Sequence, residues 1–128
     1  MLAALHIDPA RIERRIKTRY LDRESDDLEE ALRWVDEARS AREAVSIGVE
    51  ANAVDLLERL LADGVLPDVV TDQTSAHDNL HGYVPHGLSY SAAMQLRASA
   101  PAAYVERAMA SMAAHVRAML ELQKRGAV

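Results

Sequence analysis

The sequence predicts an α/β fold in which short buried strands alternate with amphipathic helices, and a long helix forms the C-terminal part of the chain. Two observations carry this prediction. Apolar runs occur at residues 2–7, 44–49 and 65–70, and segments of helical periodicity lie between them. The last two runs are joined by one helix with short links, which is typical of a right-handed parallel crossover. We therefore expect a parallel sheet with flanking helices.

The first helix is expected from Pro9 to about Arg19. Asp8 is a good N-cap and Pro9 a good first helical residue. Ile12 and Ile16 are four residues apart, so they share a face that points inward.

A second helix is expected to run to about Arg42. Residues Asp22–Asp27 form a charged turn before it, in which Ser25 or Asp26 can act as the cap. Apolar residues recur at steps of three and four and define the inward face: Leu28, Ala31, Leu32, Val35 and Ala38. The charged residues between them are expected to be solvated.

A third helix is expected to open near Asn52 and to end at about Asp63. Asn52 is placed as its N-cap, and Gly64 is a natural stop because glycine readily adopts the left-handed conformation that follows a helix. Residues Val65–Val70 should form the next strand of the sheet.

The longest helix is expected from Pro101 to near Gly126. Apolar residues alternate steps of four and three and form a seam: Val105, Met109, Met112, Val116 and Met119. We expect this seam to be core or a subunit interface, and an exposed seam would make the chain self-associate. His115 beside it is expected on the helix surface, and residues 85–99 should be polar and contain a short helix.

Composition limits the function classes. The chain has 128 residues, enough for one domain, and its net charge of -5 gives no basic surface for nucleic acid. It has no Cys, so disulfides and thiolate metal sites are excluded. No apolar run approaches the roughly 20 residues that span a bilayer, and the first residues lack the features of a secretory signal. We expect a soluble cytoplasmic protein with no nucleic-acid or membrane partner.

The stretch Asp68–Pro85 carries the strongest functional signal. Apolar Val69 and Val70 are followed at once by a cluster of polar side chains: Gln73, Thr74, Ser75, His77, Asp78 and Asn79. A strand that ends in such a cluster is the layout of a ligand loop at the carboxyl edge of an α/β sheet.

Two rival interpretations of this stretch are weak. His77 and His81 imitate a zinc motif, but that motif needs a helix, and Gly82 and Pro85 close behind favour a turn. Ser75 and His77 suggest a hydrolase, yet the G-x-S-x-G elbow is missing. We therefore predict no metal ligand and no catalytic residue in this stretch.

The order of the residues resembles one family. The run Gly64–Asp78, GVLPDVVTDQTSAHD, is similar to the signature segment of urocanase (urocanate hydratase), an enzyme of histidine breakdown that uses tightly bound NAD. The resemblance extends from about Asp8 to Gly126 and covers an internal slice of that longer enzyme. It implies that residues 1–86 are a partial Rossmann-like NAD-binding domain, without the glycine-rich turn that cradles the pyrophosphate. Residues 87–128 would be a helical extension that packs on this domain or on a partner.

The resemblance also implies a set of cofactor-binding residues. His6 stands where the family places a glutamate, and a neutral imidazole offers one acceptor atom where a carboxylate offers two. Asn79 and His81 replace a proline and an asparagine of the family. The residues that match NAD-contacting positions are Arg11, Asn52, Ala53, Gln73, Thr74, Ser75, Ala76, His77, Tyr83 and Val84. Among these, Tyr83 is expected to offer an aromatic wall to the nicotinamide.

The activity that the resemblance implies is the hydration of urocanate to imidazolone propionate, with NAD as the electrophile that adds to the imidazole ring. The family's glycine-rich turn, its active-site cysteine and most of its substrate pocket lie outside this chain, so we expect little or no activity from the chain alone. The expected partners are NAD, urocanate when the rest of the enzyme is present, and a second copy or a complementing urocanase segment. The alternatives are a non-catalytic nucleotide-binding module and a helical association module.

Overall fold

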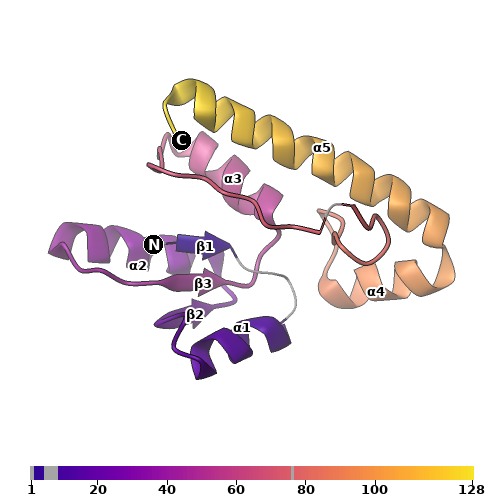
Figure 1. The fold of residues 1–128 in the computed structure, drawn as a ribbon, viewed down its shortest axis with the longest axis horizontal. Coiled ribbons are helices and arrows are strands. Elements are labelled where there is room, and N and C mark those ends of the chain that lie inside the picture. The colour runs from indigo at the N-terminus through magenta and orange to yellow at the C-terminus, as the bar shows by residue number, and fades with distance from the viewer. Residues whose placement is uncertain (1, 5–8, 76) are drawn as a thin grey trace. The chain divides into compact units, whose positions relative to one another are not determined.

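The computed structural model describes residues 2–4, 9–75 and 77–128, with side chains from residue 13 onward. The chain forms two compact units, Met1–Ala53 and Val54–Val128. The first contains the sheet, and the second is helical apart from a long connecting segment (Figure 1). Residues 54–86, which the sequence assigns to the nucleotide domain, therefore pack with the helices that follow them.

The sheet of the first unit confirms the predicted parallel α/β arrangement. Its strands are β1 (Leu2–Ala4), β2 (Arg23–Ser25) and β3 (Ile47–Val49), in the order β1-β3-β2. Both outer strands pair with β3 in parallel. Strand β2 was expected to be a charged turn. That expectation is wrong. The strand forms because its backbone pairs with β3, and its side chains have no apolar pattern that would have predicted it.

The two sides of β3 are covered differently. Ile47 and Val49 are fully buried and pack with Ala31 of the helix α2 (Leu28–Ala41). Gly48 points the other way, where an added Cβ would lie 2.6 Å from Cδ1 of the buried Leu21. A side chain at this position would force the Leu21 methyl group to move, so glycine allows the leucine to pack directly on the strand. Strand β3 is thus the core of the first unit.

The helices of the first unit largely follow their local signals. Helix α1 (Pro9–Lys17) begins where predicted and ends two residues early, with Arg19 in the left-handed conformation at φ 56°. Helix α2 is capped by Asp27, which accepts a hydrogen bond from the Glu29 amide, and not by Ser25 or Asp26 as expected. Ser25 ends β2 and donates to Oε2 of Glu30 at 2.6 Å, so its hydroxyl is already committed.

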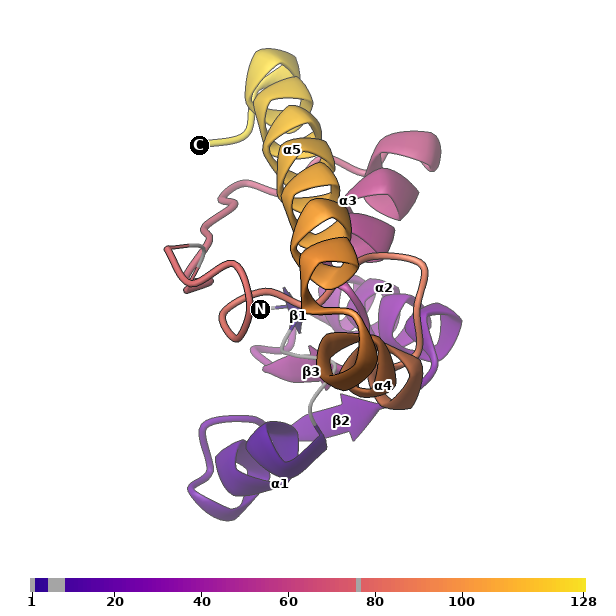
Figure 2. The same cartoon turned by 90° about the vertical axis from the view of Figure 1, so that its right-hand side faces the viewer.

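The second unit is built on one long helix. Helix α5 (Pro101–Arg125) has α4 (Tyr90–Ser99) beside its first half and α3 (Ala53–Ala62) beside its second half (Figure 1). Ala93, Tyr104 and Ala108 form the core on the α4 side, and Leu57, Ala118 and Leu122 form the core on the α3 side. Figure 2 shows the segment between α3 and α4 running beside α5. The predicted bounds of α3 and α5 are confirmed to within about one residue.

The buried face of α5 differs from the predicted seam by one residue. Met109 and Val116 of that seam are 50% and 54% exposed. The buried residues keep the same spacing one position earlier: Tyr104, Ala108, Ser111, His115, Ala118 and Leu122. The expectation that His115 lies on the surface is wrong, since it is 5% exposed. The small alanines let other segments of the chain approach α5 closely. A prediction based on large apolar residues alone does not identify this face.

The strand predicted at residues 65–70 does not form. Val69 is 62% exposed, and within the described residues the segment belongs to no sheet. Its backbone pairs instead with Val128: the Val70 amide donates to the Val128 carbonyl and the Val128 amide to the Asp68 carbonyl. The β-branched residues correctly signal extended backbone, but the local pattern cannot specify which residues it pairs with. The prediction of a parallel crossover from residues 44–49 to residues 65–70 is therefore also wrong.

In the described part of the chain, no helix combines the length and the apolar character needed to cross a bilayer.

Substitution of Asp27 tests the cap of α2. Asp27→Ala should cost about 1 kcal/mol of unfolding free energy, because the Glu29 amide loses its acceptor. Asp26→Ala is the matched control and should cost less than about 0.5 kcal/mol. Fluorescence of the single Trp, Trp34 on α2, reports urea unfolding of this unit. Equal losses in the two variants would contradict the assignment.

Candidate functional site

The candidate site is the loop of residues 71–86 in the second unit, which is shaped by two aspartates. Oδ1 of Asp72 accepts from the Thr74 amide at 2.8 Å, and its Oδ2 accepts from the Thr74 hydroxyl at 2.9 Å. Oδ1 of Asp78 accepts from the amides of Leu80 and His81 at 3.0 and 2.9 Å. These side chains satisfy backbone donors that a helix or a sheet would otherwise use.

Asp78 organises a turn where a zinc motif would need a helix. The hydrogen bond from the His81 amide is the main cause that lowers the pKa of Asp78, and the Leu80 amide adds to it. The carboxylate is therefore ionised at neutral pH and holds the turn. Residues 77–82 form a turn, as the sequence predicts, so His77 and His81 are not presented on one helix face.

Gly82 closes this turn because no other residue fits. Its amide donates to the Asp78 carbonyl at 2.8 Å, and the Asp78 amide donates to the Ser75 carbonyl at 3.0 Å. An added Cβ at Gly82 would lie 1.9 Å from the Ser75 oxygen and 2.7 Å from the Asp78 oxygen. The chain therefore folds back on itself tightly, and Ser75 lies at the point of contact.

The end of the loop is fixed to α5 by buried polar contacts. The Tyr83 hydroxyl lies 3.1 Å from Nδ1 of His115, and the Tyr104 hydroxyl donates to the Tyr83 carbonyl at 2.9 Å. The His86 amide donates to the Ser111 hydroxyl at 2.9 Å. All three α5 residues are buried, so these bonds form away from water and their loss would leave polar groups unpaired.

A second anchor joins the loop to α3. Nε2 of His86 lies 2.7 Å from Oδ1 of Asp55, which is in the first turn of that helix. Both side chains are partly exposed, so this contact is worth less than the buried ones. The loop is thereby held on two helices.

These contacts correct one expectation. Tyr83 is 5% exposed, with its ring tilted at 51° against the His115 ring. The side chain is an anchor of the loop and does not offer the expected aromatic wall.

The comparison with known families decides the identity. A family model described as the urocanase Rossmann-like domain matches residues 1–128, the whole chain. The chain belongs to the urocanase family. The match agrees with the parallel sheet, the flanking helices and the long C-terminal helix of this fold.

The urocanase resemblance assigns NAD contacts to residues of both units. Gln73, Ser75 and His77 are exposed in the loop, and their side chains make no hydrogen bond or ion pair with the part of the chain that is described. Thr74 is half-buried beside them, and Val84 packs into the core around Tyr104. These residues come from one continuous segment.

The remaining urocanase residues are placed less completely. Asn52 is 7% exposed and directly precedes α3, whose first residue is Ala53. Both belong to the first compact unit, so their relation to the loop stays a prediction. Arg11 lies in α1 with its side chain outside the described part, and His6 and Ala76 lie outside the described residues altogether.

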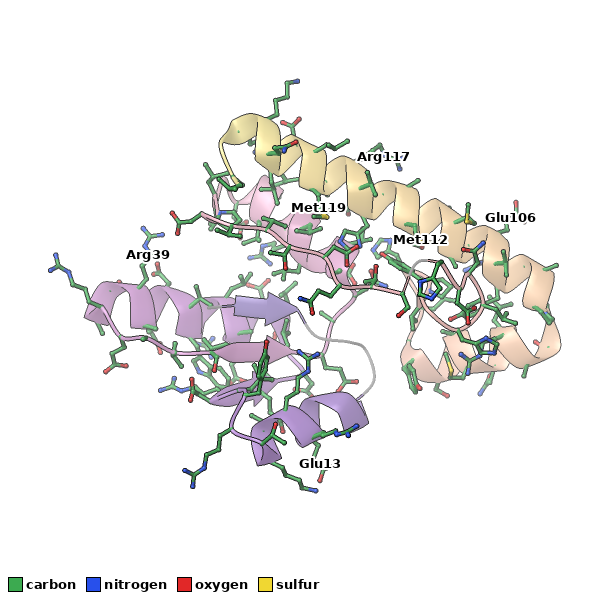
Figure 3. The ribbon with its side chains drawn as sticks, in the orientation of Figure 1. Glu13, Arg39, Glu106, Met112, Arg117 and Met119 are labelled. Atoms are coloured by element: carbon green, nitrogen blue, oxygen red, sulfur yellow. The ribbon has the colours of Figure 1, made fainter. Side chains whose placement is uncertain are left out.

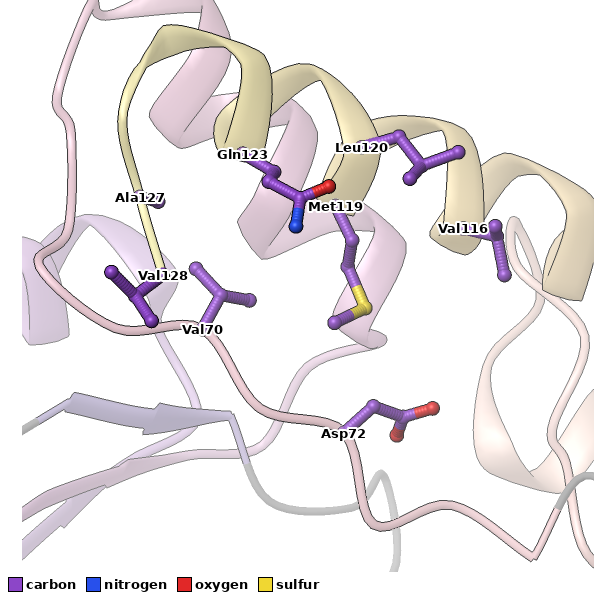
Figure 4. A pocket seen from close by; sticks show the side chains of 8 residues that line it. All are labelled: Val70, Asp72, Val116, Met119, Leu120, Gln123, Ala127 and Val128. Carbon is purple, nitrogen blue, oxygen red and sulfur yellow. The ribbon is translucent and has the colours of Figure 1, made fainter.

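A groove between the extended segment and α5 was not predicted. It has a volume of about 330 Å³, and Figure 4 shows Asp72 at one end of an otherwise largely apolar lining. The lining residues are Val70, Asp72, Val116, Met119, Leu120, Gln123, Ala127 and Val128. Val116 and Met119 belong to the predicted seam of α5, so the seam was the available signal for an apolar surface here.

Sequence patterns also missed Tyr104, Ser111 and His115 as the residues that support the loop. They lie at helical spacing on one face of α5 and are polar, but a helix in isolation shows no reason for their burial. The spacing Tyr-x6-Ser-x3-His within an alanine-rich helix was the only available signal.

The anchor predicts a pH dependence of stability. Burial is the main cause, with the charges of Asp72 and Asp55, that raises the pKa of Tyr83 to about 12 from its usual 10.0. The unfolded chain therefore loses this proton first. The stability that Tyr83 contributes is complete below pH 10 and is lost as the pH rises towards 12, by on the order of 2 kcal/mol.

Urea unfolding followed by helix circular dichroism at several alkaline pH values measures this loss. Tyr83→Phe should flatten the decline, although Tyr104, whose pKa is also raised by burial, keeps part of it. Tyr20→Phe, at a tyrosine that is 60% exposed, is the control and should leave the slope unchanged. An unaltered slope in Tyr83→Phe would contradict the buried anchor.

Proposed function

We propose that this chain supplies part of the nicotinamide nucleotide site of a urocanate hydratase, which uses NAD to add water to urocanate and form imidazolone propionate. Membership of the urocanase family supports this proposal. One observation carries the proposal. The loop is anchored by buried contacts, and it bears exposed polar side chains that make no hydrogen bond within the described part of the chain. Gln73, Ser75 and His77 are available to a ligand while Gly82 and Tyr83 fix the backbone that presents them.

The chemistry of the loop fits a nicotinamide carboxamide. That group has both N–H donors and a carbonyl acceptor, and the Gln73 amide and the Ser75 hydroxyl can each donate and accept. The His77 imidazole adds one donor and one acceptor when neutral. The Thr74 hydroxyl donates to Asp72, so its oxygen remains available as an acceptor.

The urocanase resemblance also assigns NAD contacts to Asn52, Ala53 and Arg11, which lie in the first unit. Asn52 and Ala53 lie at the N-terminus of α3, where helix amides and the helix dipole favour an anionic or carbonyl atom. When bound, NAD supplies the electrophilic ring that the reaction needs. The residues of this chain bind and orient the nucleotide, and we assign none of them to the chemical step.

The urocanase resemblance implies an active-site cysteine and a glycine-rich turn between a strand and a helix, and these 128 residues contain neither, so catalysis would need groups from outside them. We propose that the chain acts with a complementing urocanase segment, in the cytoplasm. The rival function is a nucleotide-binding module without catalysis. It is favoured by the fact that the loop and its anchors lie within one compact unit of this chain.

Titration of NAD into the chain by calorimetry tests the cofactor site. His77→Ala should weaken binding about three- to tenfold, which is the loss of one hydrogen bond. His81→Ala is the matched control, because His81 is an exposed histidine of the same loop that is not assigned to the nucleotide. Equal effects of the two substitutions would contradict the assignment of His77 to the nucleotide. No binding of NAD by the chain alone would count against the module without catalysis, and no binding by the chain mixed with a complementing urocanase segment would contradict the proposal.

The reaction is tested separately by the ultraviolet absorbance of urocanate. Mixed with a polypeptide that carries the rest of a urocanase and with NAD, the chain should cause this absorbance to fall. NAD binding with a constant absorbance would favour the module without catalysis.

A further inference from the structure

Asp72 takes up both hydrogen-bond donors of Thr74, a residue in the middle of the exposed polar cluster of the loop. Oδ1 of Asp72 accepts from the Thr74 amide at 2.8 Å, and its Oδ2 accepts from the Thr74 hydroxyl at 2.9 Å. A hydroxyl has a single proton, and here that proton is directed at the carboxylate. The half-buried Thr74 oxygen can therefore only accept a hydrogen bond from a ligand.

We propose that Asp72, acting through Thr74, makes the loop select the carboxamide of a nicotinamide dinucleotide over the carboxylate of the nicotinic acid form. This selectivity rests on the proposed function and adds to it the group that is recognised and the residue that decides. The NH2 of a carboxamide can donate to the Thr74 oxygen. A carboxylate can only accept, so it would bring two acceptors together and leave both without a donor.

The charge of Asp72 acts in the same direction. Asp72 is exposed and makes no ion pair within the part of the chain that is described. Figure 3 shows Arg117 of α5 on the side of that helix turned away from the segment between α3 and α4. After burial, the charge of Asp72 is the next cause that raises the pKa of Tyr83 to about 12, so its field extends into the loop. A ligand carboxylate beside Thr74 would be repelled by the same charge.

The other polar side chains of the loop cannot make this distinction. The Gln73 amide and the Ser75 hydroxyl can each donate and accept, so a carboxamide and a carboxylate would both find a partner there. The neutral His77 ring also has one donor and one acceptor. Among the described residues of this cluster, the discrimination therefore comes from the pair of Asp72 and Thr74.

Asp72 is held in place before a ligand arrives. Val70, two residues earlier, packs against the core on the α3 side of α5, and its amide donates to the Val128 carbonyl at 2.8 Å. Asp72 follows at one end of the groove beside α5 (Figure 4). Because the carboxylate and the Thr74 hydroxyl already form their hydrogen bond, the acceptor is oriented in advance.

Calorimetric titration of NAD and of nicotinic acid adenine dinucleotide tests this selectivity, with the chain mixed with a complementing urocanase segment. The unchanged chain should bind NAD about tenfold or more tightly than the acid form. Asp72→Asn keeps the size of the side chain and one acceptor but removes the charge, so the preference should fall to about threefold or less. Asp68→Asn, at an exposed aspartate of the same segment, is the matched control and should keep the full preference.

Two substitutions of Thr74 test the acceptor itself. Thr74→Val should weaken NAD about three- to tenfold and leave the acid form nearly unchanged, whereas Thr74→Ser, which keeps the hydroxyl, should restore the preference. A general loosening of the loop would weaken both dinucleotides equally and leave their ratio intact. NAD binding without a preference, or a full preference in Asp72→Asn, would overturn the selectivity and leave the proposed function standing. Binding of neither dinucleotide would overturn both.

Discussion

The buried contact between Tyr83 and α5 is the constraint on which the second unit depends. The Tyr83 hydroxyl meets His115, and its carbonyl accepts a hydrogen bond from Tyr104. A loop without secondary structure carries many backbone polar groups, so it can lie on a core only where side chains satisfy them. Tyr83 and Tyr104 make hydrogen bonds of this kind and fix the backbone just after the polar cluster. The exposed residues of the loop are consequently presented on a rigid support.

The same constraint explains why α5 buries the face that it does. Tyr104, Ser111 and His115 have to face the loop in order to bond with it, and Ala108 and Ala118 between them allow close packing. With this face turned to the loop, Met109, Val116 and Leu120 of α5 are exposed to solvent. A polar requirement on one side of the helix thus leaves apolar side chains exposed on the other.

Features set by local signals could be predicted from the sequence. Pro101 begins α5 and Gly64 follows α3, because proline and glycine fix the local backbone whatever lies around them. Three features could not be predicted from the sequence. Strand β2 and the extended residues 68–70 pair with backbone that is distant in the sequence. The cap of α2 could have been any of several neighbouring polar residues, of which Asp27 is the one that caps.

The candidate site shows the same division. The order of residues in Gly64–Asp78 was sufficient to identify the family and the loop. The role of Tyr83 was misjudged because an aromatic residue in a ligand loop can be wall or anchor, and only burial against His115 separates the two. Position in the sequence gives the identity of a residue but not the direction of its side chain.

Amide hydrogen exchange measured by NMR tests the central claim, that buried contacts hold this loop rigid. The amides of Gly82 and His86 donate to the Asp78 carbonyl and the Ser111 hydroxyl, and the Gln73 amide, which has no such bond within the described residues, serves as the internal reference. The account predicts that Gly82 and His86 exchange nearly as slowly as the amides of α5, and far more slowly than Gln73. Exchange of all three at the rate of an unstructured peptide, while α5 stays protected, would contradict it.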